Sequence, residues 1–317
     1  MKRIALTCIG MVLLSSGITA QRIEPIRYGD FDDWITRTIK ESAIIGGKKR
    51  TLYEVGPTQT IEGNKAYRNL GGSPWGTSNV YARVTGVTKG SNAVYPEDRP
   101  GHGKCAKLCS KLEHVRALGI INMDVMVAGS MFLGEMIEPV TSTSDPYSKM
   151  NMGVAYTKRP KNLVFDYKLV MPENATRIKA TGFGSKKKLP GTDEAAVYLY
   201  LQRRWEDAEG NIHARRVATA GRTFKKTTDW QNAYRLPLVY GDCSKDPSMK
   251  WLGLRGASNA YYARNSKGKL VPVIEEGWDS PDATPTHVML MMSAGNGEPY
   301  VGTPGLTLYV DNVGFEF

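Results

Sequence analysis

Apolar and polar residues alternate with a period of two along much of this chain, and helical periodicity is nearly absent. Such alternation is typical of β-strands that bury one face. Clusters of Gly, Pro, Asn and Asp separate the alternating segments and supply turns. Many short strands joined by turns predict an all-β protein, a jelly-roll β-sandwich of two antiparallel sheets. The predicted strands cover residues 79–87, 104–113, 119–127, 162–170, 195–206, 213–221, 233–240, 286–294 and 305–317.

The C-terminal stretch "GLTLYVDNVGFEF" (305–317) breaks this alternation in the middle. Its large apolar residues have one parity up to Val310 and the opposite parity from Val313 onward. A regular strand would therefore turn half of them away from the core. We predict a one-residue β-bulge at Asp311 and Asn312, which returns both halves to one core and turns the two polar side chains outward together.

The strand at 195–206, "AAVYLYLQRRWE", has two faces of different character. If Val197 and its apolar neighbours of the same parity face the core, the second face is an exposed surface with aromatic, amide and cationic groups. Such a surface suits stacking on a sugar and hydrogen bonding to it, although a solvated sheet face is the plainer alternative. The ligand-binding residues predicted on it are Tyr198, Tyr200, Gln202 and Arg204; Trp230, Tyr261, Tyr262 and Arg264 are predicted to rim it.

The chain begins with a segment that is not expected to belong to the fold. Lys2 and Arg3 precede a short apolar run and small residues, so residues 1–20 are predicted to be a secretory signal peptide. The run is too short to span a bilayer. Cys8 lies inside it and not at its downstream edge, where a lipid-bearing cysteine would stand. We predict an exported protein, periplasmic or at the cell surface, without a lipid anchor or transmembrane segment, in which residues 21–317 form a single domain.

Charge and cysteines add two expectations. The net charge is +11, or +9 without Lys2 and Arg3, which favours acidic partners such as uronic or sulfated glycans, with nucleic acid as a less favoured partner; scattered lysines that serve only solubility remain an alternative. Cys105 and Cys109 lie roughly 13 Å apart on one strand, too far for a mutual disulfide. At most one of them pairs with Cys243.

The densest acidic stretch is "VIEEGWDSPD" (273–282). Glycosidases use two carboxyl groups across the scissile bond, so the weak catalytic candidates are Glu275, Glu276 and Asp279, with Trp278 as a sugar-stacking residue. Their Gly- and Pro-bounded setting predicts a loop, which suits a binding or ordinary surface loop better than a rigid catalytic pair. No HExxH, GxSxG, P-loop or GxGxxG motif is present.

Several segments together resemble a known family. In order they are "GDFDDW", "SPWGTSNVY", "RPGHGKCAKLCS", "AGSMFLGEM", "MGVAYTKRPKNLVFDYKL" and "PYVGTPGLTLYVDNVGFEF". They resemble the putative carbohydrate metabolism domain family of secreted Bacteroidetes proteins, over most of residues 30–317. The resemblance implies a jelly roll similar to carbohydrate-binding modules and a role in glycan capture or processing.

The same resemblance implies a structural calcium ion. Carbohydrate-binding jelly rolls often hold calcium between an acidic residue of the first strand and an aspartate of the last. By that analogy Asp32, or Asp30, pairs with Asp311, with backbone carbonyls completing the shell. An Asp311 that only satisfies backbone donors at the bulge is the alternative.

Three functions follow from these observations. The favoured one is an exported, non-catalytic glycan-binding protein. The first alternative is a glycoside hydrolase or lyase that uses the segment 275–282. The second is a surface adhesion protein whose loops bind a protein partner.

Overall fold

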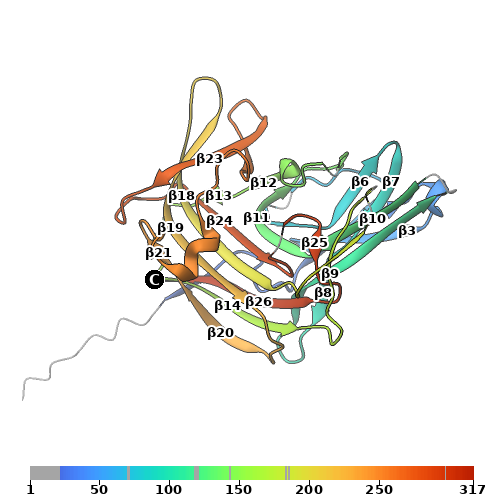
Figure 1. Ribbon diagram of the computed structural model, residues 1–317, viewed down its shortest axis with the longest axis horizontal. Helices are drawn as coiled ribbons and strands as arrows, with labels where there is room; N and C mark the ends of the chain where they lie inside the picture. Colours follow the sequence, from blue (N-terminus) through green and yellow to red (C-terminus); the bar gives the residue numbers. More distant parts are fainter. Residues whose placement is uncertain are drawn as a thin grey trace, which may run out of the picture.

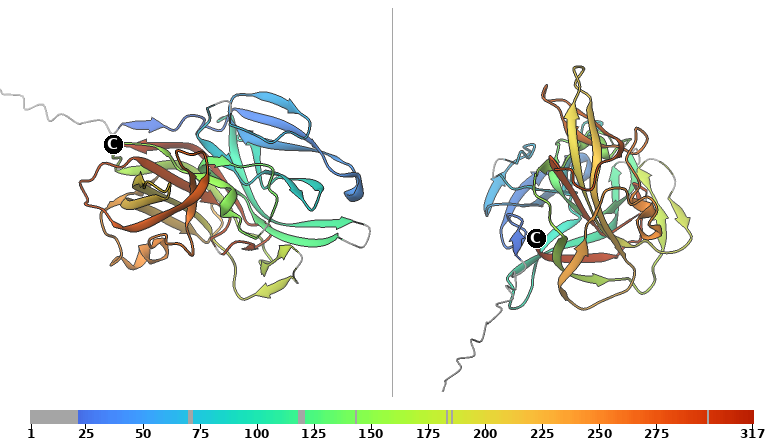
Figure 2. Two further views of the ribbon diagram at one scale, coloured as in Figure 1. Left: turned by 90° about the horizontal axis from the view of Figure 1, so that it is seen from above. Right: turned by 90° about the vertical axis from the view of Figure 1, so that its left-hand side faces the viewer.

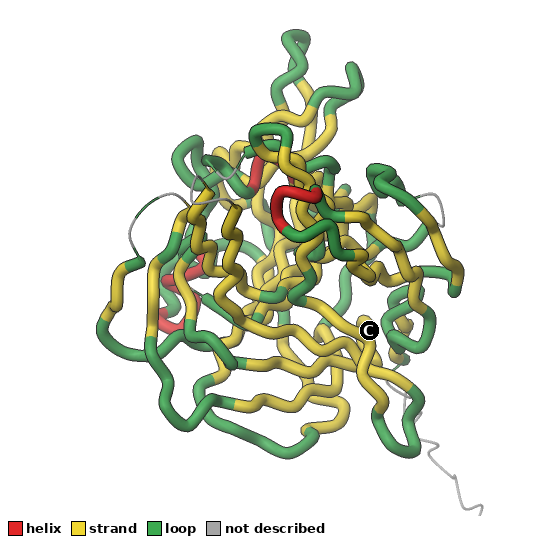
Figure 3. Tube along the Cα trace, turned by 90° about the vertical axis from the view of Figure 1, so that its right-hand side faces the viewer, coloured by secondary structure: helices red, strands yellow, loops and turns green. Residues whose placement is uncertain are grey.

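The computed structural model describes residues 22–69, 72–117, 121–142, 144–182, 184, 186–296 and 298–317. The predicted signal peptide lies outside these residues. Strands dominate the described chain, and its 3₁₀ helices are short (Figure 3): η1 (Ala43–Ile45), η2 (Tyr147–Lys149) and η3 (Pro247–Leu252). In this part of the chain, no helix has the length and apolar character needed to cross a membrane. The predicted all-β class is confirmed.

Two large sheets form the β-sandwich (Figure 1). The first has the strand order β16-β10-β9-β26-β14-β20, with β1 paired to β26 and β8 paired to β9. Its strands are β1 (Ile23–Pro25), β8 (Val94–Asp98), β9 (Lys104–Ala117), β10 (Ile121–Ala128), β14 (Asn162–Val170), β16 (Thr181–Gly182), β20 (Gln231–Pro237) and β26 (Thr307–Glu316).

The second sheet has the order β13-β24-β18-β19-β23-β22-β12-β11-β5, with β21 paired to β19. Its strands are β5 (Trp75–Thr77), β11 (Ser130–Met136), β12 (Met150–Met152), β13 (Val154–Ala155), β18 (Ala195–Glu206), β19 (Ile212–Phe224), β21 (Val239–Tyr240), β22 (Tyr261–Arg264), β23 (Leu270–Trp278) and β24 (His287–Ser293). The turns that follow β18 and β22 project together from the body of the molecule (Figure 1, Figure 2).

The main core lies between the two sheets. Alternate residues of β18, among them Val197 and Leu199, pack there with Leu308 of β26 and Phe165 of β14. These four side chains are fully buried, as the period-two pattern predicts. The sandwich is therefore held by the faces that the sequence marks as apolar.

The second sheet also curls back on itself. Strand β11 pairs with β24 through residues 130–132 and with β12 through residues 134–136, so the pairings close a ring through β18, β19, β23 and β22. A second core fills this ring and buries the other face of β18. Its buried members are Phe132, Met150, Met152, Ala196, Tyr198, Tyr200, Cys243, Met249, Leu252, Tyr261, Met289 and Met291.

Three smaller sheets complete the fold. The order β3-β2-β4 and the hairpin β6–β7 build the N-terminal end, and β17-β15-β25 lies beside β10. The N-terminal strands lie at the opposite end of the molecule from the projecting turns of the second sheet (Figure 1). The strands of the three smaller sheets are β2 (Trp34–Lys40), β3 (Lys49–Val55), β4 (Gln59–Glu62), β6 (Val80–Val84), β7 (Val87–Ser91), β15 (Arg177–Lys179), β17 (Lys187–Leu189) and β25 (Val301–Gly302).

Strand β9 links the sandwich to this end. Its first half pairs with β8 and β26, and its second half pairs with β10 beyond the core. It carries Cys105 and Cys109, which were predicted not to pair with each other; both are free thiols, as is Cys243.

The predicted bulge is present in β26. Asp166 pairs with Asp311, whereas Val164 pairs with Gly314, so β26 has one extra residue between these positions. Asn312 has a φ of 51°, and both Val310 and Val313 belong to the main core. The predicted outward turn holds only for Asn312. Asp311 is 1% exposed, because its carboxylate is buried against a guanidinium.

Substitutions at Asn312 test the strain at the bulge. The left-handed conformation costs a β-branched residue of the order of 1–2 kcal/mol more than it costs glycine. We therefore expect Asn312→Val to be about 1–2 kcal/mol less stable than Asn312→Gly in urea denaturation. Both variants lose the hydrogen bond from Asn312 Nδ2 to Asp166, so their difference isolates the backbone. Equal stabilities of the two variants would contradict the left-handed conformation of residue 312.

Candidate functional site

A cleft of about 510 Å³ lies where the ring of the second sheet meets β9, β10 and the β6–β7 hairpin. Residues of η2, η3 and the segment 295–301 also line it. Its volume falls in the range of about 300–1,000 Å³ that is typical of small-molecule sites. This cleft is the candidate site.

One side of the cleft, the aromatic wall, consists of Tyr147, Tyr198, Trp251, Arg255 and Tyr261. Tyr147 and Tyr261 meet edge to face with ring centroids 5.2 Å apart, and Tyr198 and Trp251 do so at 5.7 Å. The hydroxyls of Tyr198 and Tyr261 share a 2.6 Å hydrogen bond. Burial raises the pKa of both phenols, so they remain protonated at neutral pH. Half-buried Tyr147 and Trp251 offer the ring surface that stacks on a sugar.

A buried ion pair supports the aromatic wall from inside the ring. Arg216 Nε donates to Glu275 Oε1 at 2.5 Å, and neither side chain has exposed area. Glu275 Oε2 accepts from the backbone N–H of Arg255 at 2.7 Å, and Arg216 Nη1 donates to the carbonyl of Leu252 at 3.2 Å. Burial opposes ionisation of Glu275, but the charge of Arg216 outweighs it and lowers the pKa of Glu275. The pair therefore fixes the segment that carries Trp251 and Arg255.

Another part of the cleft lining, the aliphatic wall, consists of Val80, Ala82, Val84, Val115, Val125 and Val127. Residues two apart on β6 and on β10 point to the same side, which explains why each strand contributes alternate positions. All six are partly exposed. Partly exposed apolar groups gathered in one cleft mark a binding surface more often than scattered ones do.

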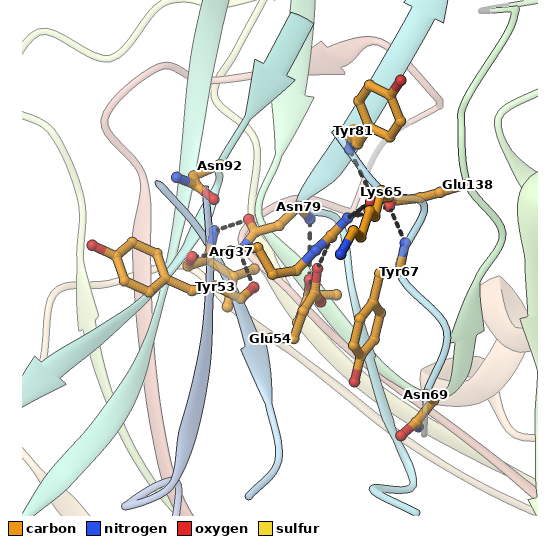
Figure 4. Close-up of polar contacts among 12 residues, drawn as sticks. Arg37, Tyr53, Glu54, Lys65, Tyr67, Asn69, Asn79, Tyr81, Asn92 and Glu138 are labelled. Carbon is orange, nitrogen blue, oxygen red and sulfur yellow. Dashed lines mark hydrogen bonds and ion pairs between the residues drawn. The ribbon is translucent and has the colours of Figure 1, made fainter. Parts of the chain in front are cut away.

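A second buried network holds β6 in place (Figure 4). The Arg37 guanidinium lies between two carboxylates, at 2.7 Å from Glu54 and 2.5 Å from Glu138. Glu138 also accepts from the backbone N–H groups of Tyr67 at 2.8 Å and Tyr81 at 2.7 Å. Since Tyr81 lies between Val80 and Ala82, this network positions the aliphatic wall.

The structure corrects the prediction that one face of β18 is an exposed binding surface. Tyr198 is 8% exposed, Tyr200 is fully buried and Gln202 is 3% exposed. Arg204 is half-buried and donates to Gln202 and to the carbonyl of Met152. The face is covered because the second sheet closes into a ring and η3 packs inside it. Of these predicted residues, Tyr198 lines the cleft.

The predicted tryptophans lie elsewhere. Trp230 covers the Arg99 guanidinium, 3.9 Å from its ring centroid. The ring centroid of Trp278 lies 5.4 Å from the Arg216 guanidinium, and the side chain packs on the second core. Neither is among the described residues that line the cleft, and ligand contact for both stays a prediction. Tyr261, predicted at the rim, does line it.

The acidic segment is also placed differently from the prediction. Glu275, Glu276 and Trp278 belong to strand β23 and not to a loop. Glu275 pairs with Arg216, Glu276 with His213 at 2.7 Å, and Asp279 with Arg203 at 2.6 Å. These cations lower the pKa of Glu275 and Asp279, whereas a general acid for glycoside cleavage needs a raised one. Glu275 and Asp279 are therefore ion-pair partners and not suited to act as the acid, and any other catalytic role of the three carboxylates stays a prediction.

Asp32 and Asp311 do not fit a calcium site. Asp32 Oδ1 accepts from the backbone N–H of Lys104 at 2.7 Å, whereas Asp311 pairs with Arg99 at 2.5 Å. The guanidinium occupies the coordinating oxygen and its charge repels a second cation. Among the residues that the structure describes, no three His, Cys, Asp or Glu side chains gather as metal ligands.

The sequence reasoning missed Tyr147, Trp251 and Arg255. Trp251 and Arg255 stand in "KWLGLRG" (250–256), where a tryptophan and an arginine close to glycines, outside any alternating segment, were the available signal. Their meeting with the aliphatic wall depends on ring closure, which no local pattern shows.

No curated protein matches this chain. A putative glycoside hydrolase from Bacteroides thetaiotaomicron VPI-5482 is similar with a TM-score of 0.49 and 17% identity, over 86% of this chain and 68% of that one. Another from Bacteroides vulgatus ATCC 8482 gives a TM-score of 0.45 and 15% identity, over 93% of this chain and 94% of that one. TM-scores this low establish no shared activity.

The family comparison is more informative. The family described as putative carbohydrate metabolism domain matches residues 39–263. The matched part contains the aliphatic wall, the aromatic wall and the ion pair partner Arg216. The match spans more than half of the 317 residues, and the chain therefore belongs to the putative carbohydrate metabolism domain family.

Proposed function

We propose that this protein binds glycans in the cleft between the aromatic and aliphatic walls and takes part in glycan capture or processing. The observation that carries the proposal is the aromatic wall, in which Trp251 and Tyr147 line a cleft of about 510 Å³. Sugar rings present apolar C–H faces that stack on such rings, and hydroxyl and guanidinium groups beside them fix orientation. Membership of a carbohydrate metabolism family favours this ligand class.

The proposal includes export through the predicted signal peptide at residues 1–20. An exported glycan-binding protein meets polysaccharides before they enter the cell, which suits a capture role. Cell fractionation tests this part separately, because retention of the full chain in the cytoplasm would contradict export without touching glycan binding.

Removing the Trp251 ring is the direct test of glycan binding. We expect the wild-type protein to be retarded by at least one polysaccharide in affinity electrophoresis, across a panel of neutral and acidic plant, microbial and host glycans. Trp251→Ala should weaken that binding about tenfold or more, the scale expected for loss of a stacked ring.

Trp205→Ala is the matched control. Trp205 is 39% exposed on the projecting hairpin, so this variant removes an exposed tryptophan outside the cleft and should bind as the wild type does. If no glycan in the panel is retained, or if Trp205→Ala weakens binding as much as Trp251→Ala, glycan binding in this cleft is wrong.

A further inference from the structure

Arg255 is a cation on the aromatic wall that lacks an anionic partner. Its guanidinium lies 4.7 Å from the Tyr261 ring centroid and 5.9 Å from that of Tyr200, and Nη2 donates to the Tyr200 hydroxyl at 3.3 Å. The Nε atom is buried and has no hydrogen-bond partner among the described residues. No carboxylate in the described part of the chain forms an ion pair with this side chain. Arginine stays charged at every physiological pH, so Arg255 brings to the cleft a positive charge that no carboxylate of the described chain contacts directly.

The buried arginines of the described chain are compensated. Arg37, Arg99 and Arg216 are at most 3% exposed, and each pairs with a carboxylate. An unpaired buried charge is costly, and a planar guanidinium is suited to bidentate binding of a carboxylate or sulfate. Arg255 is half-buried, and an anion of a ligand in the cleft would supply the partner that it lacks.

The aliphatic wall indicates what the rest of that ligand must be. Six partly exposed valine and alanine side chains, defined above, offer neither donor nor acceptor to a sugar hydroxyl. Hydroxyls buried there would lose hydrogen bonds to water without replacement, at a cost of about 1–3 kcal/mol each. An alkyl or aryl substituent would instead bury its own apolar surface.

We propose that the cleft recognises an anionic glycoside that carries an apolar aglycone. The anionic group of the sugar, a carboxylate or a sulfate, binds Arg255, and the aglycone lies on the aliphatic wall. This inference rests on the proposed glycan-binding function and names its ligand class.

Paired synthetic glycosides test the two halves separately. The probes are octyl glycosides of glucose, galactose and mannose below their micelle concentrations, the corresponding octyl uronides and 6-sulfates, and the methyl uronides. Isothermal titration calorimetry is expected to show that at least one octyl uronide or sulfate binds ten times more tightly than its neutral octyl counterpart. The same anionic octyl glycoside should bind ten times more tightly than its methyl counterpart. The uronide and sulfate series distinguish the two anions.

The variants assign each preference to its wall. Arg255→Met should remove the preference for anionic over neutral sugars and keep the preference for octyl over methyl glycosides. Arg255→Lys should keep part of the preference for anionic sugars. Val125→Asn should reduce the octyl preference alone. Arg264→Met is the matched control, because Arg264 is an exposed arginine on β22 that does not line the cleft. This variant should change neither the anion preference nor the octyl preference. Circular dichroism confirms that each variant is folded.

Two results would overturn the inference. One is equal binding of neutral and anionic octyl glycosides by the wild type; the other is an anion preference that Arg255→Met leaves intact. If no glycoside binds while a polysaccharide still depends on Trp251, the inference fails and the proposed function stands. If no polysaccharide is retained either, the proposed function itself fails.

Discussion

Arg216→Met is expected to lower the free energy of unfolding by about 3–5 kcal/mol, the scale for breaking a fully buried ion pair from one side. The change leaves Glu275 in the second core with no cation, although Gln202 still donates to it at 2.6 Å. It also removes the guanidinium that lies 3.4 Å from the Tyr200 ring centroid. Urea denaturation at pH 7 measures the loss.

Arg203→Met is the matched control for this prediction. Arg203 makes two hydrogen bonds to Asp279, at 2.6 Å and 3.1 Å, but its side chain is 48% exposed. Exposed pairs contribute about 0–1 kcal/mol, so this variant should stay within about 1 kcal/mol of the wild type. A similar loss in both variants would show that burial of Glu275 is not what makes the pair important.

The same ion pair bears on the hydrolase alternative. If Glu275 were a catalytic acid, Glu275→Gln would abolish product formation in a folded protein. The structure instead leads us to expect a destabilised protein, because Glu275 accepts hydrogen bonds from Arg216, Gln202 and the backbone of Arg255. A carboxylate with no exposed area cannot reach a glycosidic oxygen without local unfolding.

The strands could be predicted well because their information is local. Residues 162–170 and 195–206 were predicted with the bounds that β14 and β18 have. The bulge was also predictable, since the parity change at Asp311 has few other solutions when both halves must be buried. Alternation of side chains and the requirement to bury apolar groups are enough for these features.

The site could not be predicted because it depends on long-range pairing. The polar face of β18 looked exposed, as it would be in an open sandwich. It is buried because β11 pairs with β24 and closes the ring, which places Phe132 and Met291 against that face. Strand alternation distinguishes two faces of a strand, but it does not say whether the second face meets water or another part of the chain.

The buried charges of the two ends of the molecule are arranged in opposite ways. At the N-terminal network, Glu54 and Glu138 share the one guanidinium of Arg37, so carboxylates are in excess. Inside the ring, Glu275 serves Arg216 while Arg255 and the half-buried Arg204 have no carboxylate. Burial accordingly lowers the pKa of Arg204 to about 10. Of these residues only Arg255 is among the described residues that line the cleft, and a cation at that position is what an anionic ligand would require.

Arg37→Met is expected to destabilise the protein by about 3–5 kcal/mol at pH 8 and by less at pH 5. Burial raises the pKa of Glu54 to about 8 even with Arg37 present. A carboxyl group whose pKa in the folded state is above its unfolded value of 4.5 favours the folded state when protonated, so stability falls as the pH rises from about 4.5 through 8. Without Arg37 the pKa of Glu54 rises further and the fall continues to higher pH. Urea denaturation at both pH values measures the difference.

Glu54→Gln separates the charge of Glu54 from its packing. Glutamine has nearly the same shape and can still accept from Arg37 and Thr77, which donates to Glu54 at 3.0 Å, but it does not titrate. Relative to the wild type, this variant should therefore be more favourable at pH 8 than at pH 5 by at least about 1.4 kcal/mol, the equivalent of one pKa unit. In the Arg37→Met background it should restore part of the lost stability at pH 8. If Arg37→Met destabilises equally at both pH values and Glu54→Gln restores nothing, the two carboxylates do not compete for one guanidinium, and the network holds β6 by hydrogen-bond geometry alone.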